Sequence, residues 1–127
     1  MACRILIAED EPHIVELLSF MLGRAGYEVQ TATTGAAALE RALAEPPDAM
    51  ILDVMLPELN GFELLRRLRA NPTGRGLPVI MLTAKGQRED RETAARLAVD
   101  AFITKPFSNA ELLEKVTRLT AARDPAR

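Results

Sequence analysis

The sequence has one cysteine, Cys3, among its 127 residues, so no disulfide can form within the chain. A domain of this size buries roughly two-thirds of its unfolded surface and needs no disulfide or structural metal to fold. Such chains are typical of the reducing cytosol, so we expect a cytoplasmic protein in which Cys3 packs as a small apolar side chain. There is no signal pattern and no apolar run near the roughly 18 residues of a membrane span, so we expect no membrane contact.

Histidine and glycine-rich loops are equally scarce. The only histidine, His13, falls in a helical pattern, where we expect a solvated side chain, so no Ser–His–Asp arrangement can form. The sequence contains neither the Gly-x-x-x-x-Gly-Lys loop of nucleotide-binding proteins nor the Gly-x-Gly-x-x-Gly fingerprint of dinucleotide binding. With a net charge of −2, the domain is not expected to bind nucleic acid directly.

Four short apolar runs each lead to a residue that can take part in phosphate or metal chemistry. They are Ile5–Ala8 before Glu9 and Asp10, Ala49–Leu52 before Asp53, Val79–Leu82 before Thr83, and Ala101–Thr104 before Lys105. Short aliphatic runs separated by helix-length segments are typical of parallel strands buried on both faces. Ligands of such sheets bind beyond the carboxyl ends of the strands. We therefore expect three carboxylates, a hydroxyl and an amine at one edge of a sheet.

The pattern between these runs predicts strands and helices in alternation, which favours an α/β doubly wound domain of five parallel strands and five flanking helices. A further, less covered strand is expected at Tyr27–Ala32. The expected helices begin at Pro12, after Thr34, at Phe62, near Gln87 and near Ser108, and the second to fourth end at Ala44, Ala70 and Ala98. Inward-facing positions in the first helix would be Ile14, Leu17, Leu18 and Met21. We expect residues 1–122 to form the domain and residues 123–127 to be a tail or the start of a linker.

The three acids form the most informative cluster, because Glu9, Asp10 and Asp53 become neighbours if the first and third strands are adjacent. Like charges about 4 Å apart repel by about 4 kcal/mol at an effective dielectric constant of about 20, so the cluster must protonate, be solvated or hold a cation. Oxygen ligands without histidine or cysteine select Mg²⁺ or a similar ion over Zn²⁺. The alternative is that the acids merely lie near helix N-termini, where negative charge is favourable; it is weakest for Asp53, whose helix begins several residues later.

Thr83 and Lys105 carry little information one at a time, since threonine is a common strand residue and lysine is usually a solvated surface amine. Opposite a metal-bound carboxylate, however, a hydroxyl and an ammonium can surround the equatorial oxygens of a phosphoryl group. The complete set therefore indicates phosphoryl chemistry.

Four segments carry a resemblance that covers essentially the whole chain. They are Ile-Leu-Ile-Ala-Glu-Asp-Glu-Pro, Ile-Leu-Asp-Val-Met-Leu-Pro-Glu-Leu-Asn-Gly, Met-Leu-Thr-Ala-Lys-Gly and Phe-Ile-Thr-Lys-Pro-Phe. In this order and spacing they resemble the receiver domain of bacterial two-component response regulators. The resemblance implies a flavodoxin-like, three-layer fold with strand order 2-1-3-4-5. It also implies a phosphoprotein of phosphorelay signal transduction and transcription regulation.

The resemblance implies a phosphoacceptor and a metal site. Asp53 would take a phosphoryl group from the phosphohistidine of a sensor histidine kinase or a histidine phosphotransfer protein. Asp10, Asp53 and the backbone carbonyl of Met55 would bind Mg²⁺ or Mn²⁺, and Glu9 would assist through water. Lys105 would pair with Asp53 at rest and with the phosphoryl oxygens afterwards.

The resemblance also implies a switch. Thr83 would turn inward to hydrogen-bond the aspartyl phosphate, and a cis bond before Pro106 would aim the amine of Lys105. Phe102 resembles the family's aromatic switch position, which turns inward when Thr83 moves, although an ordinary core role fits the residue equally well. Because phenylalanine lacks the hydroxyl of tyrosine, such a switch would work by packing alone.

Charged residues of the last two helices and the strand between them resemble those of regulators with a winged-helix DNA-binding output. The set is Glu89, Arg91, Asp100, Glu111 and Lys115. In that subfamily they form salt bridges across a symmetric dimer of phosphorylated receivers; the alternative is pairing within one solvated helix, Glu111 with Lys115 and Glu114 with Arg118. Ala101 and Thr117 depart from the subfamily pattern. We also expect Val99 at the position where the family usually has a left-handed glycine, which would alter the end of the fourth helix.

Three functions compete. We favour a phosphoacceptor signalling switch that has limited activity on itself and is not a turnover enzyme, with a single-domain phosphorelay shuttle as its variant. A phosphohydrolase with an aspartyl phosphate would want Asp-x-Asp, and Met55 occupies the second position. A receiver-like module without phosphorylation would not be expected to retain the acids and the lysine.

Overall fold

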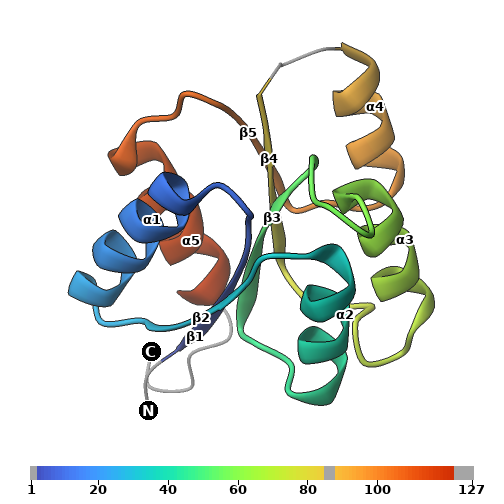
Figure 1. The fold of residues 1–127 in the computed structure, drawn as a ribbon, viewed down its shortest axis with the longest axis horizontal. Coiled ribbons are helices and arrows are strands. Elements are labelled where there is room, and N and C mark those ends of the chain that lie inside the picture. The colour runs from blue at the N-terminus through green and yellow to red at the C-terminus, as the bar shows by residue number, and fades with distance from the viewer. Residues whose placement is uncertain (1–2, 85–87, 122–127) are drawn as a thin grey trace.

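In a computed structural model, the described residues, 3–84 and 88–121, form a single parallel sheet with helices on both faces (Figure 1). The strands are β1 (Arg4–Ala8), β2 (Glu28–Ala32), β3 (Ala49–Asp53), β4 (Val79–Thr83) and β5 (Ala101–Thr104). The helices are α1 (Pro12–Arg24), α2 (Gly35–Ala44), α3 (Gly61–Ala70), α4 (Arg88–Arg96) and α5 (Asn109–Ala121). The predicted alternation of strands and helices is confirmed.

The strand order is β2-β1-β3-β4-β5, with every neighbouring pair parallel, as the resemblance implied. The register sets the carboxyl ends of the strands level with one another. Ala8 pairs with Leu52, Asp53 with Leu82, and Thr83 with Thr104. The polar residues at the ends of four strands therefore meet at one edge of the sheet.

Helices α1 and α5 cover one face of the sheet, and α2, α3 and α4 cover the other (Figure 1). Side chains alternate between the two cores: in β1, Ile5 and Ile7 pack towards the α1 and α5 face, while Leu6 and Ala8 pack towards the opposite face. Every residue of β3 and β4 is buried, whereas β2 is partly exposed, as expected. Burial on both faces explains why the central strands read as continuous apolar runs.

Side-chain caps place several helix starts where the sequence predicts them. Glu11 accepts hydrogen bonds from the amides of His13 and Ile14, with Pro12 as the first helical residue. Thr34 caps α2, and Ser108 accepts the Glu111 amide at 2.9 Å. These bonds satisfy amides that have no partner inside the helix.

Three details of the helices differ from the predictions. Helix α3 begins one residue early, at Gly61, and α4 ends at Arg96 rather than Ala98, while its predicted start at Gln87 lies outside the described residues. The predicted inward residue Leu17 is 41% exposed. The buried stripe of α1 runs through Leu18 and Leu22. Leu17, which precedes Leu18, lies about 100° around the helix from that stripe and therefore faces solvent.

The prediction for Val99 is wrong, because the left-handed residue at the end of α4 is Ala98, with φ of 59°. The amide of Ala98 bonds to the carbonyl of Ala95, and the amide of Val99 bonds to that of Ala94. This is the Schellman arrangement, in which the residue after the left-handed one packs back on the helix. Val99 packs in this way against the core that contains Ala94. Hydrogen-bond register, which the sequence pattern does not reveal, decides which residue takes positive φ.

Ala98→Gly is expected to raise the free energy of unfolding by about 0.5–1 kcal/mol. A left-handed alanine costs about 1–2 kcal/mol, and glycine removes that cost. Part of the gain is offset because glycine has more conformational freedom than alanine in the unfolded chain. Urea denaturation measures the change. The matched control is Ala95→Gly, an exposed position inside α4, which should lose stability. Destabilisation by both glycines would contradict a left-handed Ala98.

The remaining expectations concern surface and membrane. His13 is exposed, as expected, and Cys3 is half-buried. Within residues 3–84 and 88–121, no helix has the length and apolar character needed to cross a membrane.

Candidate functional site

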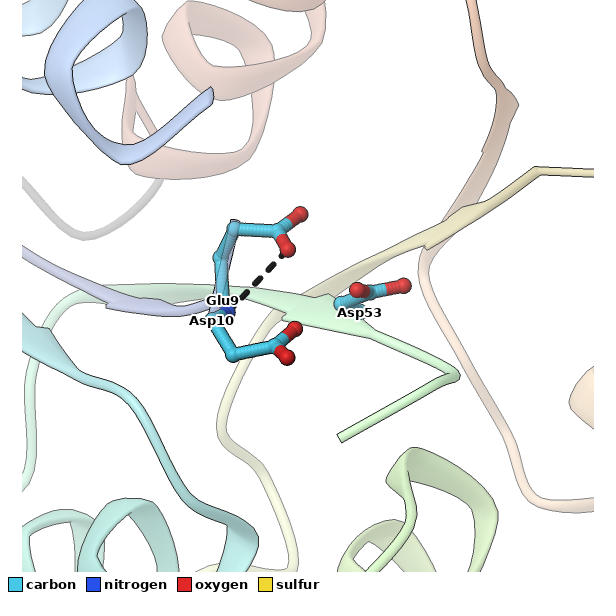
Figure 2. Close-up of side chains that lie close together, drawn as sticks. All are labelled: Glu9, Asp10 and Asp53. Carbon is cyan, nitrogen blue, oxygen red and sulfur yellow. Dashed lines mark hydrogen bonds between the residues drawn. The ribbon is translucent and has the colours of Figure 1, made fainter. Parts of the chain in front are cut away.

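Glu9, Asp10 and Asp53 lie together at the carboxyl edge of the sheet (Figure 2), and one carboxylate oxygen from each lies within 4.8 Å of the others. Glu9 and Asp10 follow β1, and Asp53 ends β3, the strand paired with β1. Glu9 is fully buried and Asp53 is 3% exposed, whereas Asp10 is open to solvent. The expected cluster of three acids is therefore formed.

Lys105 supplies a cation to this cluster. Its Nζ lies 2.9 Å from Glu9 Oε1 and 3.3 Å from Asp53 Oδ2. The Lys105 amide donates a hydrogen bond to the carbonyl of Thr83, which continues the pairing of β4 with β5. This bond fixes the position of the Lys105 backbone, from which the side chain extends. The Lys105–Pro106 bond is cis, as the resemblance implied. One ammonium thus pairs with two buried carboxylates and offsets the charge of only one of them.

Glu9 uses both of its oxygens within the chain. Oε1 faces Lys105, while Oε2 accepts the amides of Asp10 and Glu11, each at 3.1 Å. Burial raises the pKa of Glu9, an effect that the Lys105 hydrogen bond opposes and that the nearby Asp53 reinforces. Burial alone would lower the pKa of Lys105, but the hydrogen bond to Glu9 and the charges of Asp53 and Glu9 outweigh it, so this pKa is raised. The ammonium is therefore firmly charged.

Asp53 is held from two sides. Its Oδ1 accepts the backbone amide of Met55 at 3.2 Å, and its Oδ2 faces Lys105. The side chain of Met55 is 72% exposed, so this residue serves the site through its backbone. The Asp53 carboxylate is consequently fixed in direction, while Asp10 and the side chain of Met55 beside it are open to solvent.

Gly61 is a site residue whose importance sequence reasoning missed. A Cβ atom there would overlap the carbonyl oxygen of Asp53 and lie 2.9 Å from the Cα of Val54. The Gly61 amide also bonds to the Val54 carbonyl at 2.8 Å, which folds the loop after β3 back on itself. Gly61 ends one of the four segments that carry the resemblance, but the need for a glycine there does not follow from the pattern, because close approach of backbones depends on the packed fold.

Thr83 and Phe102 lie on the neighbouring strands β4 and β5. Thr83, at the end of β4, is 3% exposed. Phe102 is half-buried and packs against the core beneath α2, α3 and α4. The guanidinium carbon of Arg91, in α4, lies 5.4 Å from the centre of the Phe102 ring. Both proposed switch residues thus lie on the β4 and β5 side of the site.

Of the other predicted interface residues, Glu89 belongs to α4, and the rest lie on or beside β5 and α5. Asp100 Oδ2 accepts the Val79 amide at 2.7 Å and pairs with Arg69 at 3.3 Å, so Asp100 already has partners within the chain. Glu111 is exposed and Lys115 is half-buried on α5, and the side chain of Glu89 lies outside the described structure.

A pocket of about 120 Å³ is lined by Asp100, Ala101, Phe102, Lys115, Arg118 and Leu119. The expected pair of Glu114 and Arg118 forms at 3.0 Å.

The donor set fits a hard divalent cation. The three clustered side chains offer carboxylate oxygens only, which suits Mg²⁺ or Mn²⁺ and not Zn²⁺. Negative charge near helix N-termini does not account for the cluster, because Asp53 precedes α3 by several residues and is buried with Glu9.

Known proteins resemble this chain in sequence and in fold. A sequence model described as the response regulator receiver domain matches residues 5–117. The alkaline phosphatase synthesis transcriptional regulatory protein PhoP of Bacillus subtilis (strain 168) is 43% identical over 113 residues, which are 89% of this chain and 46% of that protein. The phosphate regulon transcriptional regulatory protein PhoB of Rhizobium meliloti (strain 1021) is 39% identical over 98% of this chain and 55% of its own length. The chain thus spans about half the length of these curated relatives.

A solved structure gives the same result and bears on the metal. The receiver domain of a sensor histidine kinase from Pseudomonas aeruginosa PAO1 is 33% identical, with a TM-score of 0.88 over 95% of this chain and 99% of that one. Its crystal structure has a magnesium ion coordinated in the active-site cleft. Because family match, relatives and fold agree over nearly the full length, the chain belongs to the response regulator receiver domain family.

Proposed function

We propose that the chain is a phosphoacceptor signalling switch in which Asp53 receives a phosphoryl group from the phosphohistidine of a histidine kinase or a histidine phosphotransfer protein. One observation carries the proposal: Asp53 is almost fully buried, yet its carboxylate faces an ammonium 3.3 Å away and shares its site with two other acids. This arrangement suits a fixed carboxylate nucleophile whose product is strongly anionic.

The transfer is a single displacement at phosphorus. An Asp53 carboxylate oxygen attacks, the new O–P bond forms, and the P–N bond to the donor imidazole breaks, with its electron pair leaving on the ring nitrogen. Charge spreads over the three equatorial phosphoryl oxygens. Lys105, whose pKa is raised by Glu9 and Asp53 against the effect of burial, supplies a full positive charge to these oxygens. The hydroxyl of Thr83 donates a hydrogen bond to the aspartyl phosphate.

Asp10, Asp53 and the Met55 backbone carbonyl would hold Mg²⁺ or Mn²⁺, with Glu9 in a supporting place. When bound, the ion neutralises charge on the phosphoryl oxygens. Both oxygens of Glu9 already have partners, Lys105 on one side and two loop amides on the other. That occupancy supports a contribution of Glu9 through water.

The output would be a changed surface on α4, β5 and α5, produced as Thr83 and Phe102 turn inward. This surface controls a partner or a DNA-binding domain, and a homodimer through Glu89, Arg91, Asp100, Glu111 and Lys115 is one form of it. Residues 1–122 would be the receiver and residues 123–127 the start of a linker in a cytoplasmic regulator. Curated relatives of about twice this length that are transcriptional regulators support that form over a single-domain shuttle.

The test is covalent labelling. The chain is incubated with a small phosphodonor such as acetyl phosphate and Mg²⁺, and its intact mass is followed with time. We expect the mass of one phosphoryl group to be added, and a chelator to prevent it. A mass that stays unchanged, with Mg²⁺ present and excess donor, would reject the proposal.

A further inference from the structure

Arg91 and Phe102 form a contact between α4 and β5 that the proposed chemistry at Asp53 does not use. The guanidinium carbon lies 5.4 Å from the ring centre, within the distance at which a cation is attracted to the face of an aromatic ring. Arg91 is exposed, and Phe102 is half-buried. The ring therefore keeps one side in the core and presents the other to a cation at the surface.

The contact between Arg91 and Phe102 occurs in the same structure as the ion pairs of Lys105 with Glu9 and Asp53. Lys105 is paired with Asp53 and Glu9, as expected when its ammonium is not engaged by a phosphoryl group. A phenylalanine at this position has no hydroxyl with which to hold a half-exposed ring in place. The guanidinium of Arg91 supplies a polar partner for the ring instead.

We propose that Arg91 is a latch on Phe102, which stabilises the half-exposed ring and must be released before the ring turns inward. The inference rests on the proposed function, because it concerns the same switch. A contact made in only one of two states shifts the equilibrium towards that state by its own free energy. Arg91 is thus a positioning residue that sets how readily modification of Asp53 is converted into the changed surface.

The sign of the effect separates the latch from simple electrostatics. Removal of a positive charge ordinarily weakens the binding of an anion by a nearby site. Loss of the latch instead frees the ring and strengthens binding of any anion that favours the inward state. The two explanations therefore predict opposite changes for the same variant.

The experiment measures the affinity of the full chain for beryllofluoride in the presence of Mg²⁺, by calorimetry. The variants are Arg91→Gln, Phe102→Leu and the double variant, with Arg96→Gln as the matched control. Arg96 is an exposed arginine of the same helix whose guanidinium bonds to Thr93. We expect Arg91→Gln to bind about two- to fivefold more tightly, the size expected for an exposed cation–π contact. Arg96→Gln should leave the affinity unchanged.

The double variant decides the mechanism. If the latch acts through the ring, Arg91→Gln has no effect in the Phe102→Leu background. Unchanged or weaker binding by Arg91→Gln, or the same gain with leucine at 102, would overturn the latch while leaving the proposed function intact. Failure of the wild-type chain to bind beryllofluoride would overturn the proposed function and the latch together.

Discussion

Asp53→Asn is expected to take up no phosphoryl group under conditions in which the wild-type chain is labelled to completion. The asparagine amide is neutral and does not attack phosphorus, whereas the wild-type carboxylate is fixed by the Met55 amide and faces Lys105. Its side-chain oxygen can still accept the Met55 amide, and Lys105 keeps its ion pair with Glu9. The fold should therefore persist while the chemistry is lost. Intact-mass spectrometry over a time course, with far-ultraviolet circular dichroism as a check of folding, measures both.

The matched control for that experiment is Glu58→Gln. Glu58 is an exposed carboxylate in the same loop, five positions after Asp53, and has no part in the acidic cluster. It should be labelled at the wild-type rate. Equal labelling of Asp53→Asn and wild type would show that another carboxylate is the acceptor and would end the assignment.

Lys105→Met is expected to lower the free energy of unfolding by about 3 kcal/mol at neutral pH. The variant leaves Glu9, which is fully buried, and Asp53, which is nearly so, without their common cation. Loss of one partner of a buried ion pair costs about 3–5 kcal/mol because the remaining charge is uncompensated. The lower end applies here because Asp10 and the adjoining edge are open to solvent.

The loss should depend on pH in a defined direction. Burial raises the pKa of Glu9 in the folded protein, and without Lys105 the opposing hydrogen bond is gone, so the folded form holds the proton more tightly than the unfolded form. A group of this kind stabilises below its unfolded pKa, and that stability is lost as pH rises through the folded pKa. The difference between wild type and Lys105→Met should thus be small in acid and grow towards neutrality.

Urea denaturation at a series of pH values, with and without Mg²⁺, measures this difference. Mg²⁺ should recover part of the lost stability, because a cation in the acidic cluster replaces the missing ammonium. Lys115→Met, a half-buried lysine on α5 that does not contact the acids, is the control and should show no such dependence on pH. A loss of equal size at every pH would mean that Lys105 contributes packing and not charge.

The central strands and the reactive residues could be predicted from the sequence because burial on both faces leaves an unmistakable trace. Several apolar runs such as Ala49–Leu52, separated by helix-length segments, are typical of strands between two layers, and the polar residue after each run then falls at the carboxyl edge of the sheet. Local hydrogen bonds likewise explain why the starts after Thr34 and near Ser108 were predictable, since each cap lies within three residues of the amide it satisfies. The strand order came from the resemblance, as periodicity does not specify which strands pair.

The end of α4 and the contacts between distant segments were decided only by the folded structure. The left-handed residue is Ala98 rather than Val99 because the last hydrogen bonds of α4 set its end. Gly61 matters because the loop after β3 folds onto the backbone of Asp53. Arg91, which was expected to form a salt bridge across a dimer, lies over the ring of Phe102, the expected switch residue. The sequence by itself determined the layered sheet and the chemistry at its edge, through burial and local caps; the tertiary structure decided which side chains share partners, because such contacts depend on the relative placement of whole elements.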